Sequence, residues 1–394
     1  MHCGASPECR LCASHRDAAD PGSAGPQACP LGGSAQRFGG DIRLLEFCMN
    51  AQIALILGQD GITNGAIYAL LALSILLVFT VTRVLFIPQG EFVAFGALTM
   101  AAMQAGKPIL LVWLLLAFAL AETAADLMAR RKRPARRGAH WRMAAKVIYP
   151  LALALLLYRL PLAQLPMAVQ ALLTLLLLVP MGPQLYRLFY QPIASASTLV
   201  LLIVSIAVHL ALVGLGLLAF GAEGARTAPF SDASLSLGPV NVNSQALWVV
   251  AVSVVLIVVL YQFFERSMYG KALRAAAFNR IGARLMGISP VFAGKATFFL
   301  AALIGTVSGI LIAPITTMYF DSGFMVSLKG FVGAIIGGLV SYPLAAAGAV
   351  LVGLIEAFSS FWASAYKEII VFTLIIPVLL WRSLNSHHVE EEDE

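Results

Sequence analysis

The chain alternates between long apolar runs and short polar islands. Runs of about 20 residues recur, and this is the length that an α-helix needs to cross the hydrocarbon core of a bilayer. The pattern predicts spans over residues 51–83, 109–128, 147–165, 166–189, 198–220, 247–264, 291–313, 344–360 and 368–381. Two stretches, 84–97 and 314–341, are interrupted by Pro or Gly and predict short, broken helices. We therefore expect an all-α fold, a polytopic transmembrane helical bundle with about 9–11 membrane segments.

One polar island, residues 265–290, separates two of the longest runs. Its basic residues are Arg266, Lys271, Arg274, Arg280 and Arg284. This excess of positive charge predicts a cytoplasmic location. Good helix formers with apolar residues near helical spacing predict an amphipathic helix from Lys271 to Met286, ended by Gly287. Two interpretations are open: a connector that rests on lipid headgroups, or a docking helix that fits a groove in a soluble partner.

Composition supports a membrane protein. Hydrophobic residues make up 60% of the chain and charged residues 12%, and the mean hydropathy is +0.86. Soluble proteins have about 45–50% apolar and about 25% charged residues. The net charge of +6 resides in loops, above all in eight Lys and Arg residues between Arg130 and Lys146. Only Trp141 accompanies that basic run as an aromatic, so we expect orientation and contact with anionic lipid rather than nucleic-acid binding.

The two ends of the chain differ from this central part. Residues 1–48 are rich in Gly, Ala, Ser and Pro and predict a disordered extension, and translation starting at Met49 is one explanation for it. Residues 49–385 form the predicted transmembrane domain, with a basic insertion near 129–146, and residues 386–394 form an acidic tail. Four of the five cysteines crowd into the first thirty residues, but their spacing matches no common zinc site, so we expect no metal.

Several motifs resemble a known family. Arg274-Ala275, followed by Ala283 and by the residues from Leu285 to Ile288, is similar to the cytoplasmic coupling loop of permease subunits of branched-chain amino acid ABC importers. The family's other motifs are matched by Gly90-Glu91, Tyr190-Gln191-Pro192, the glycine-rich stretch 323–338 and Tyr366-Lys367-Glu368. The resemblance covers roughly residues 49–385.

The resemblance implies roles for particular residues. Contact with the ATPase would involve Lys271, Arg274, Ala275, Arg280, Ala283, Leu285 and Gly287. The translocation path would be lined by Phe86, Gly90, Glu91, Phe324, Ser327, Lys329, Gly333 and Gly337. The implied partners are a second, related permease chain, two cytoplasmic ABC ATPases, a periplasmic substrate-binding protein and membrane lipid. The implied location is the bacterial inner membrane.

Three ionisable residues inside apolar segments each allow two interpretations. Glu91 is either an interfacial helix cap or a residue that lines the path. His209 is favoured as a packed, neutral side chain over a ligand-binding one. Glu356 is either functional or a hydrogen-bonded structural group that faces the bundle.

The chain has no recognisable means of hydrolysing ATP. The stretch Gly294-Lys295-Ala296-Thr297 lacks the first glycine and the hydroxyl residue of a phosphate-binding loop. We therefore expect no cofactor on this chain and ATP on its partners. An ion-coupled secondary transporter is the alternative, with Glu356 as its one deep carboxylate. A membrane-embedded enzyme is a further class, but no cluster with catalytic or ligand spacing is visible.

Overall fold

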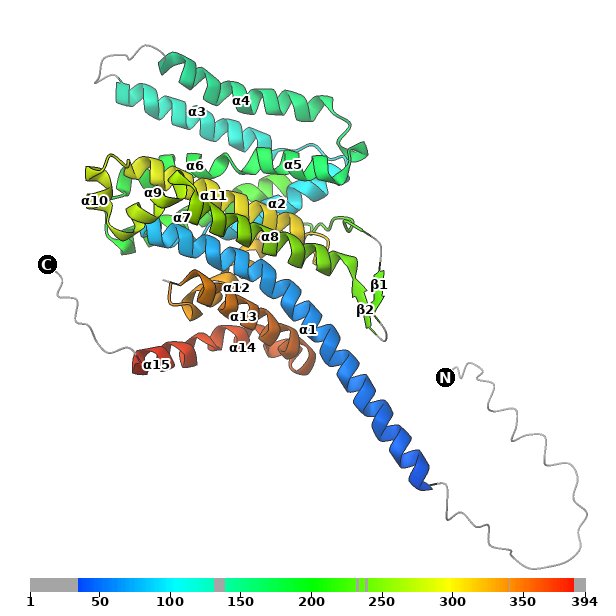
Figure 1. Ribbon diagram of the computed structural model, residues 1–394. Helices are drawn as coiled ribbons and strands as arrows, with labels where there is room; N and C mark the ends of the chain where they lie inside the picture. The colour runs from blue at the N-terminus through cyan, green and yellow to red at the C-terminus, as the bar shows by residue number, and fades with distance from the viewer. Residues whose placement is uncertain (1–34, 131–138, 232–233, 238–239, 340, 386–394) are drawn as a thin grey trace, which may run out of the picture. The chain divides into compact units, whose positions relative to one another are not determined.

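The computed structural model describes residues 35–130, 139–231, 234–237, 240–339 and 341–385, and these residues are almost entirely helical (Figure 1). The first seven helices are α1 (Ala35–Thr82), α2 (Gln89–Gln104), α3 (Leu111–Arg130), α4 (Ala139–Arg159), α5 (Met167–Leu178), α6 (Met181–Leu185) and α7 (Thr198–Phe220). The later helices are α8 (Ser244–Arg266), α9 (Met268–Phe278), α10 (Arg280–Leu285), α11 (Pro290–Ile312), α12 (Ser322–Ile336), α13 (Tyr342–Trp362), α14 (Lys367–Thr373) and α15 (Ile375–Asn385). Short 3-10 turns occur at Leu162–Gln164, Gln191–Ile193 and Ser364–Tyr366, and a π-helix occurs at Tyr186–Tyr190.

The chain divides into two compact units, residues 1–51 and 52–394. The predicted extension lies outside the described residues as far as position 34, and α1 begins within it at Ala35. The predicted acidic tail, 386–394, also lies outside them.

Eight helices of the described residues are long and apolar enough to cross a membrane, which confirms the all-α polytopic bundle. Eight of the nine predicted long spans are among them. The ninth, 147–165, was wrong in extent. It corresponds to the second half of α4, whose apolar part stops at Arg159 and is followed by Pro161. The short helices α2 and α12 bring the number of segments into the predicted range.

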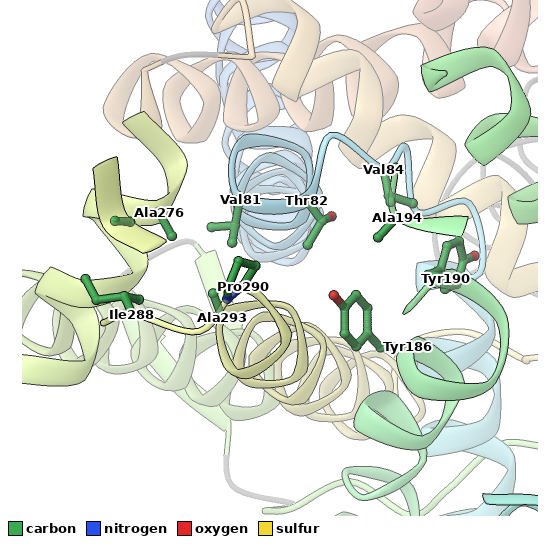
Figure 2. Close-up of a pocket in the computed structure, with 11 residues that line it drawn as sticks. Val81, Thr82, Val84, Tyr186, Tyr190, Ala194, Ala276, Ile288, Pro290 and Ala293 are labelled. Atoms are coloured by element: carbon green, nitrogen blue, oxygen red, sulfur yellow. The ribbon is translucent and has the colours of Figure 1, made fainter. Parts of the chain in front are cut away.

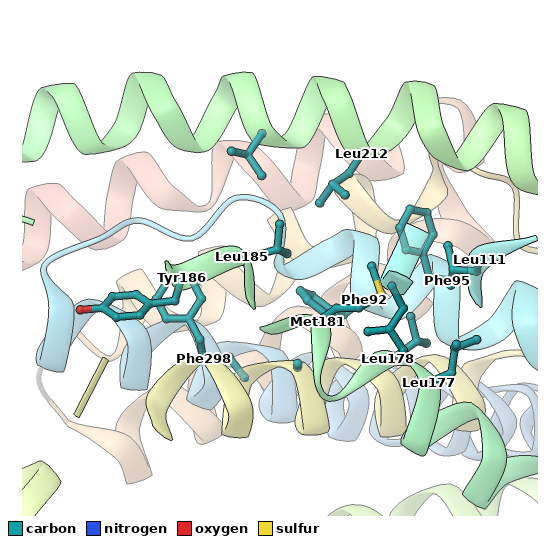
Figure 3. Packing of buried hydrophobic residues seen from close by; sticks show 14 of the residues in the cluster. Phe92, Phe95, Leu111, Leu177, Leu178, Met181, Leu185, Tyr186, Leu212 and Phe298 are labelled. Carbon is teal, nitrogen blue, oxygen red and sulfur yellow. The ribbon is translucent and has the colours of Figure 1, made fainter. Parts of the chain in front are cut away.

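The helix α2 lies at the centre of the packing. It begins at Gln89, directly after Pro88, and nearly all of its residues are buried. Pro88 interrupts the stretch 84–97 as predicted, whereas Gly90 lies within α2. It packs against α11, where Gly305 and Gly309 leave room for its backbone. Beside it, large apolar side chains from α2, α5, α6, α7 and α11 form one cluster, whose labelled members include Phe92, Met181, Leu212 and Phe298 (Figure 3).

A second close contact joins α1 and α13. A Cβ atom added to Gly61 would lie 2.8 Å from the Cα of Leu354, and one added to Gly65 would lie 2.8 Å from the Cα of Val350. Gly353 of α13 fits between these two glycines of α1. Gly61 and Gly65 therefore allow α1 to pack closely against α13.

The two ends of the bundle carry different elements (Figure 1). At one end, α9 and α10 lie beside the C-terminal residues of α1 and the start of α11. Three basic residues lie near one another there, because Lys295 is close enough to Lys146 and Arg187 to interact with them electrostatically. We therefore call this the basic end. At the opposite end, the loop between α7 and α8 forms a two-stranded antiparallel hairpin, β1 (Ser234–Leu237) and β2 (Val240–Asn243). We call this the hairpin end. Its two short strands were not predicted.

Candidate functional site: the basic-end helices and the α2–α12 cavity

The polar island 265–290 folds as two short helices rather than the single helix that the sequence predicted. The side chain of Ser267 accepts hydrogen bonds from the amides of Tyr269 and Gly270 and so caps α9. Asn279 interrupts the helix with extended backbone angles (φ −145°, ψ 102°), and its side chain accepts a hydrogen bond of 2.8 Å from the amide of Gly282 at the start of α10. The cap formed by Asn279 therefore outweighs the high helix propensity of the residues around it.

Gly287 ends α10 as predicted. Its φ of +84° lies in the left-handed region that favours glycine. The Gly287 amide bonds to the Arg284 carbonyl, and the Ile288 amide bonds to the Ala283 carbonyl. This C-terminal cap turns the chain sharply toward α11.

One face of α9 and α10 packs on the bundle. Leu273, Ala276 and Ala283 are buried there, in a cluster with Leu77 and Val81 of α1 and with Ala293 of α11. Of the predicted ATPase contacts, Ala283 therefore belongs to the face turned toward the bundle. The side chain of Arg280 lies outside the described residues.

Large apolar side chains are also exposed on α9 and α10 and directly after α10. Five of them are between 76% and 89% exposed: Met268, Phe278, Ile281, Leu285 and Met286. We call these five residues the outer patch. Lys271, Ala275 and Gly287, three more of the predicted contacts, are exposed on the same helices or directly after them.

Arg274, the predicted centre of the coupling loop, bonds within its own chain. Its Nη1 donates to Oε1 of Glu265 at 2.8 Å, and its Nη2 donates to the carbonyl oxygen of Phe264. The pair is partly exposed, so its electrostatic contribution to stability is small. Its effect is geometric instead, because these two bonds fix the angle at which α9 leaves the end of α8.

A small cavity of about 110 Å³ lies behind the two helices. Figure 2 shows Ala276 and Ile288 on one side of it, and Tyr186 and Tyr190 of the π-helix on the other. Thr82, near the C-terminal end of α1, also lines it. The basic-end helices are thus not packed solidly against the bundle on this side.

The predicted translocation path centres on the contact between α2 and α12. Gly90 and Gly323 touch backbone to backbone: a Cβ on either glycine would overlap the carbonyl oxygen of the other. Next to this crossing is an almost wholly apolar cavity of about 270 Å³. Three predicted path residues, Phe86, Phe324 and Ser327, line it together with Leu202 of α7.

The other predicted path residues lie elsewhere. Gly333 packs against Ala349, and Gly337 packs against Ala345, so these two glycines allow α12 to approach α13 closely. Gly90 serves the helix crossing in the same way. In the structure, backbone contact rather than the cavity accounts for all three glycines.

Glu91 is buried beside His209. Glu91 is 1% exposed, and its Oε1 lies 2.9 Å from Nδ1 of His209 on α7. The ring of His209 faces that of Phe324, with centroids 4.8 Å apart. Through Phe324, this pair adjoins the apolar cavity. The sequence interpretation of His209 as a packed side chain holds, but its carboxylate neighbour could not be seen from the sequence.

A second buried charge cluster joins α1, α12 and α13. Nζ of Lys329 donates to Oε1 of Glu356 at 2.5 Å, and the hydroxyl of Tyr68 donates to Oε2 of the same carboxylate at 2.6 Å. The Lys329 and Glu356 side chains are 8% and 11% exposed. Of the two interpretations of Glu356, the structure matches the hydrogen-bonded group that faces the bundle. Lys329 points to this carboxylate and is not among the residues that line the cavity.

A partly exposed ion-pair network ties the helices of the basic insertion to the bundle. Glu122 and Asp126 are four residues apart on α3 and so share one face, and both bond to Lys146 of α4, at 2.7 and 3.0 Å. Arg187 of the π-helix also pairs with both carboxylates. The basic run itself, residues 130–142, lies largely outside the described residues.

Comparison with known proteins places this geometry in context. A family model described as "Branched-chain amino acid transport system / permease component" matches residues 145–379, more than half of the chain. The high-affinity branched-chain amino acid transport system permease protein LivH of Escherichia coli is 28% identical over 210 residues, which cover 50% of this chain and 67% of that protein. The corresponding permease protein BraD of Pseudomonas aeruginosa is 26% identical over 208 residues, covering 51% and 68%. No solved structure matches.

Proposed function

Because the chain belongs to the family of permease components of branched-chain amino acid transport systems, we propose that it carries branched-chain amino acids, or related small amphoteric solutes, through the inner membrane as one subunit of an ATP-binding-cassette importer. It is a multi-pass transport subunit and not an enzyme. In this proposal, ATP is bound and hydrolysed on separate ATPase chains.

The outer patch on α9 and α10 carries the proposal. A connector that only rests on headgroups needs one apolar face and one polar face. Here one apolar face is already used against α1 and α11, and a second, formed by Phe278, Leu285 and their neighbours, is left exposed among Lys and Arg residues. An exposed apolar patch with a charged rim is typical of a protein-docking surface.

The proposed partners follow from the family. Membership in an ABC transport system implies ATPase and binding-protein partners in general. We propose two cytoplasmic ATPases, and one of them binds the outer patch. The other proposed partners are a second, related permease chain and a periplasmic binding protein, which binds at the hairpin end.

The proposed mechanism uses the contacts at the basic end. When the ATPases close, the outer patch moves with them, and α9 and α10 carry the motion to α1 and α11 through their buried faces. The small cavity behind Ala276 leaves space for this displacement. Because α2 touches both α11 and α12, a tilt of α11 changes the crossing beside the Phe86–Phe324 cavity and so alternates access to it.

The experiment targets the outer patch. We expect Phe278→Ser together with Leu285→Ser to reduce the affinity for the purified ATPase by about tenfold or more, because aromatic and aliphatic anchors supply much of the binding energy of an interface. Trp362→Ser is the matched control, since Trp362 is equally exposed but lies at the far end of α13. Equal binding by the patch variant and the control would refute the docking role.

The ion-coupled alternative finds less support. Such a transporter needs a carboxylate that can take up and release an ion inside the membrane. Glu356, the candidate for that role, already bonds to Lys329 and Tyr68.

A further inference from the structure

At the hairpin end, a polar cavity of about 800 Å³ lies between α1 and the segment that follows α7. Nine of its thirteen lining residues have polar side chains, whereas the cavity beside Phe324 is almost wholly apolar. Its volume falls within the range of about 300–1,000 Å³ that is usual for small-molecule sites. Neither the predicted path nor the outer patch includes any of its residues.

Two opposite charges face this cavity from different elements. Asp60 comes from α1, and Arg226 comes from the segment after α7. In the described parts of the chain, neither side chain takes part in an ion pair. Asp60 also shares its helix face with Asn64, one turn later, which lines the same cavity. Because the Asp60 carboxylate and the Arg226 guanidinium are not paired with each other, each can bind a ligand group of the opposite charge.

The position of Arg226 is fixed. Ala225 and Met318 exchange two backbone hydrogen bonds of 2.9 and 3.0 Å, and the Thr227 amide donates to the Ala313 carbonyl at 3.2 Å. The Arg226 Nε itself donates to the Pro314 carbonyl at 2.9 Å. Arg226 is therefore held on both sides and through its own Nε, while its terminal nitrogens remain available for an acceptor.

Thr227 follows Arg226 in the cavity wall and is only 5% exposed. Its hydroxyl oxygen is turned away from the cavity and has no hydrogen-bond partner among the described residues, so the polar groups offered to a ligand are those of Asp60 and Arg226 and of the neighbouring amide and hydroxyl side chains. Part of the cavity wall is apolar, with Ala246 and Ile315.

We propose that this cavity is a binding site for the zwitterionic head of a free amino acid. The carboxylate bonds to the terminal nitrogens of Arg226, the ammonium group bonds to Asp60, and an aliphatic side chain lies against Ala246 and Ile315. An anion or a cation alone satisfies only half of this arrangement. The inference rests on the proposed function, in which the solute arrives at the hairpin end, and it makes this cavity the first binding site of the permease.

The test measures equilibrium binding to the full-length chain, purified with its partner permease and ATPases but without the binding protein. Three radiolabelled probes are compared: leucine, leucinamide, which lacks the carboxylate, and 4-methylpentanoate, which lacks the ammonium group. We expect wild type to bind leucine at least tenfold more tightly than either analogue, because hydrogen bonds to charged groups are among the stronger ones.

Each charge then has its own signature. Asp60→Asn should weaken leucine binding about tenfold or more and remove the preference for leucine over 4-methylpentanoate. Arg226→Gln should also weaken leucine binding about tenfold or more, and it should remove the preference for leucine over leucinamide. Arg226→Lys, which keeps the charge, should retain part of that preference. Thermal unfolding of Arg226→Gln shows whether loss of its bond to Pro314 has unfolded the loop. Glu223→Gln is the control, because it removes a charge from the same loop outside the cavity.

Two results would overturn the inference. One is that both cavity variants bind all three probes as wild type does. The other is that leucine binding is unchanged while affinity for the binding protein falls, which would make the cavity a protein-docking surface. If wild type shows ATP-dependent leucine uptake and the variants match it in uptake and binding, only this inference fails. If wild type neither binds nor takes up leucine, the proposed function fails with it.

Discussion

At the scale of single residues, burial determines how strongly an ion pair affects the stability of the protein. Lys329 and Glu356 are almost fully buried and are bonded to each other, with Tyr68 as a third member. Removing one partner of a buried ion pair leaves an uncompensated charge, whereas replacing both by apolar residues removes the problem. Arg274 and Glu265 form a pair of similar length at the partly exposed end of α8, where solvent screens the interaction. The two pairs should therefore respond differently to substitution.

We predict that Lys329→Met and Glu356→Leu each destabilise the protein by about 3–5 kcal/mol, and that the double variant costs less than either single one. Tyr68→Phe should cost about 1–3 kcal/mol, because it removes a donor from the carboxylate. Denaturant unfolding in detergent gives these values. Lys107→Met, at an exposed position, is the control and should change stability by less than about 0.5 kcal/mol. Additive effects of the two single substitutions would contradict the coupling.

These residue contacts were beyond sequence reasoning. Tyr68 and Glu356 are 288 positions apart, and nothing in either neighbourhood signals the other. His209 and Glu91 could each be recognised as a polar residue in an apolar helix, but only the packing of α7 on α2 brings them to 2.9 Å.

At the scale of elements, local chemistry predicted most boundaries. Pro88 marks the start of α2, and the polar residues that flank the apolar run place α7 at the predicted residues 198–220. The break at Asn279 was missed because Ala, Leu and Arg around it favour helix, and the outcome depends on one side-chain cap. Gly333 and Gly337 pack against α13 and not beside the apolar cavity, and their place in the translocation path stays a prediction, because a glycine that lines a path and one that admits a neighbouring helix look identical in a sequence.

The junction between α8, α9 and α11 supplies the next prediction. Arg274→Gln together with Gly287→Ala should lower the amount of solute moved per ATP hydrolysed, while membrane insertion stays unchanged. The first change frees α9 from Phe264 and Glu265, and the second strains a position with φ of +84° by about 1 kcal/mol. Parallel assays of ATPase activity and uptake in proteoliposomes measure the ratio. If the double variant moves as much solute per ATP hydrolysed as wild type does, the junction between α8, α9 and α11 does not transmit the motion.

The α1–α13 crossing gives a prediction with a built-in control. Gly65→Ala places a methyl group 2.8 Å from the Cα of Val350 and should destabilise the protein by about 1–3 kcal/mol. Gly58→Ala on the same helix meets nothing within 4 Å and should be neutral or slightly stabilising, since Ala favours helix over Gly. Thermal unfolding compares the two. Equal effects would mean that the close approach of the two helices is not important for stability.

At the scale of the whole molecule, the two ends of the bundle carry different candidate sites. The basic end carries the outer patch and the ion-pair network of α3 and α4, and the hairpin end carries the polar cavity. Composition and the apolar runs were enough to predict the membrane fold, because it depends on sums over many residues, whereas the orientation inferred from loop charge stays a prediction. The cavities were not predictable, since each is lined by residues from several distant segments.

Orientation can be tested directly. We predict that Leu285→Cys reacts with an impermeant maleimide only from the cytoplasmic side, and that Pro229→Cys, which lines the polar cavity, reacts only from the outside. The five native cysteines, at positions 3, 9, 12, 29 and 48, are first replaced by Ser. Right-side-out and inverted vesicles distinguish the two sides. Labelling of Leu285→Cys from outside would place the outer patch where no ATPase can reach it.

The energy source is the most direct test of the whole account. Proteoliposomes that contain this chain with its partner permease and ATPases, supplied with binding protein and leucine outside, are assayed for uptake with and without ATP inside. We expect uptake that requires ATP, persists when a protonophore collapses ion gradients, and falls with the Phe278→Ser and Leu285→Ser variant. Uptake that proceeds without ATP and stops with the protonophore would contradict the account and favour an ion-coupled transporter.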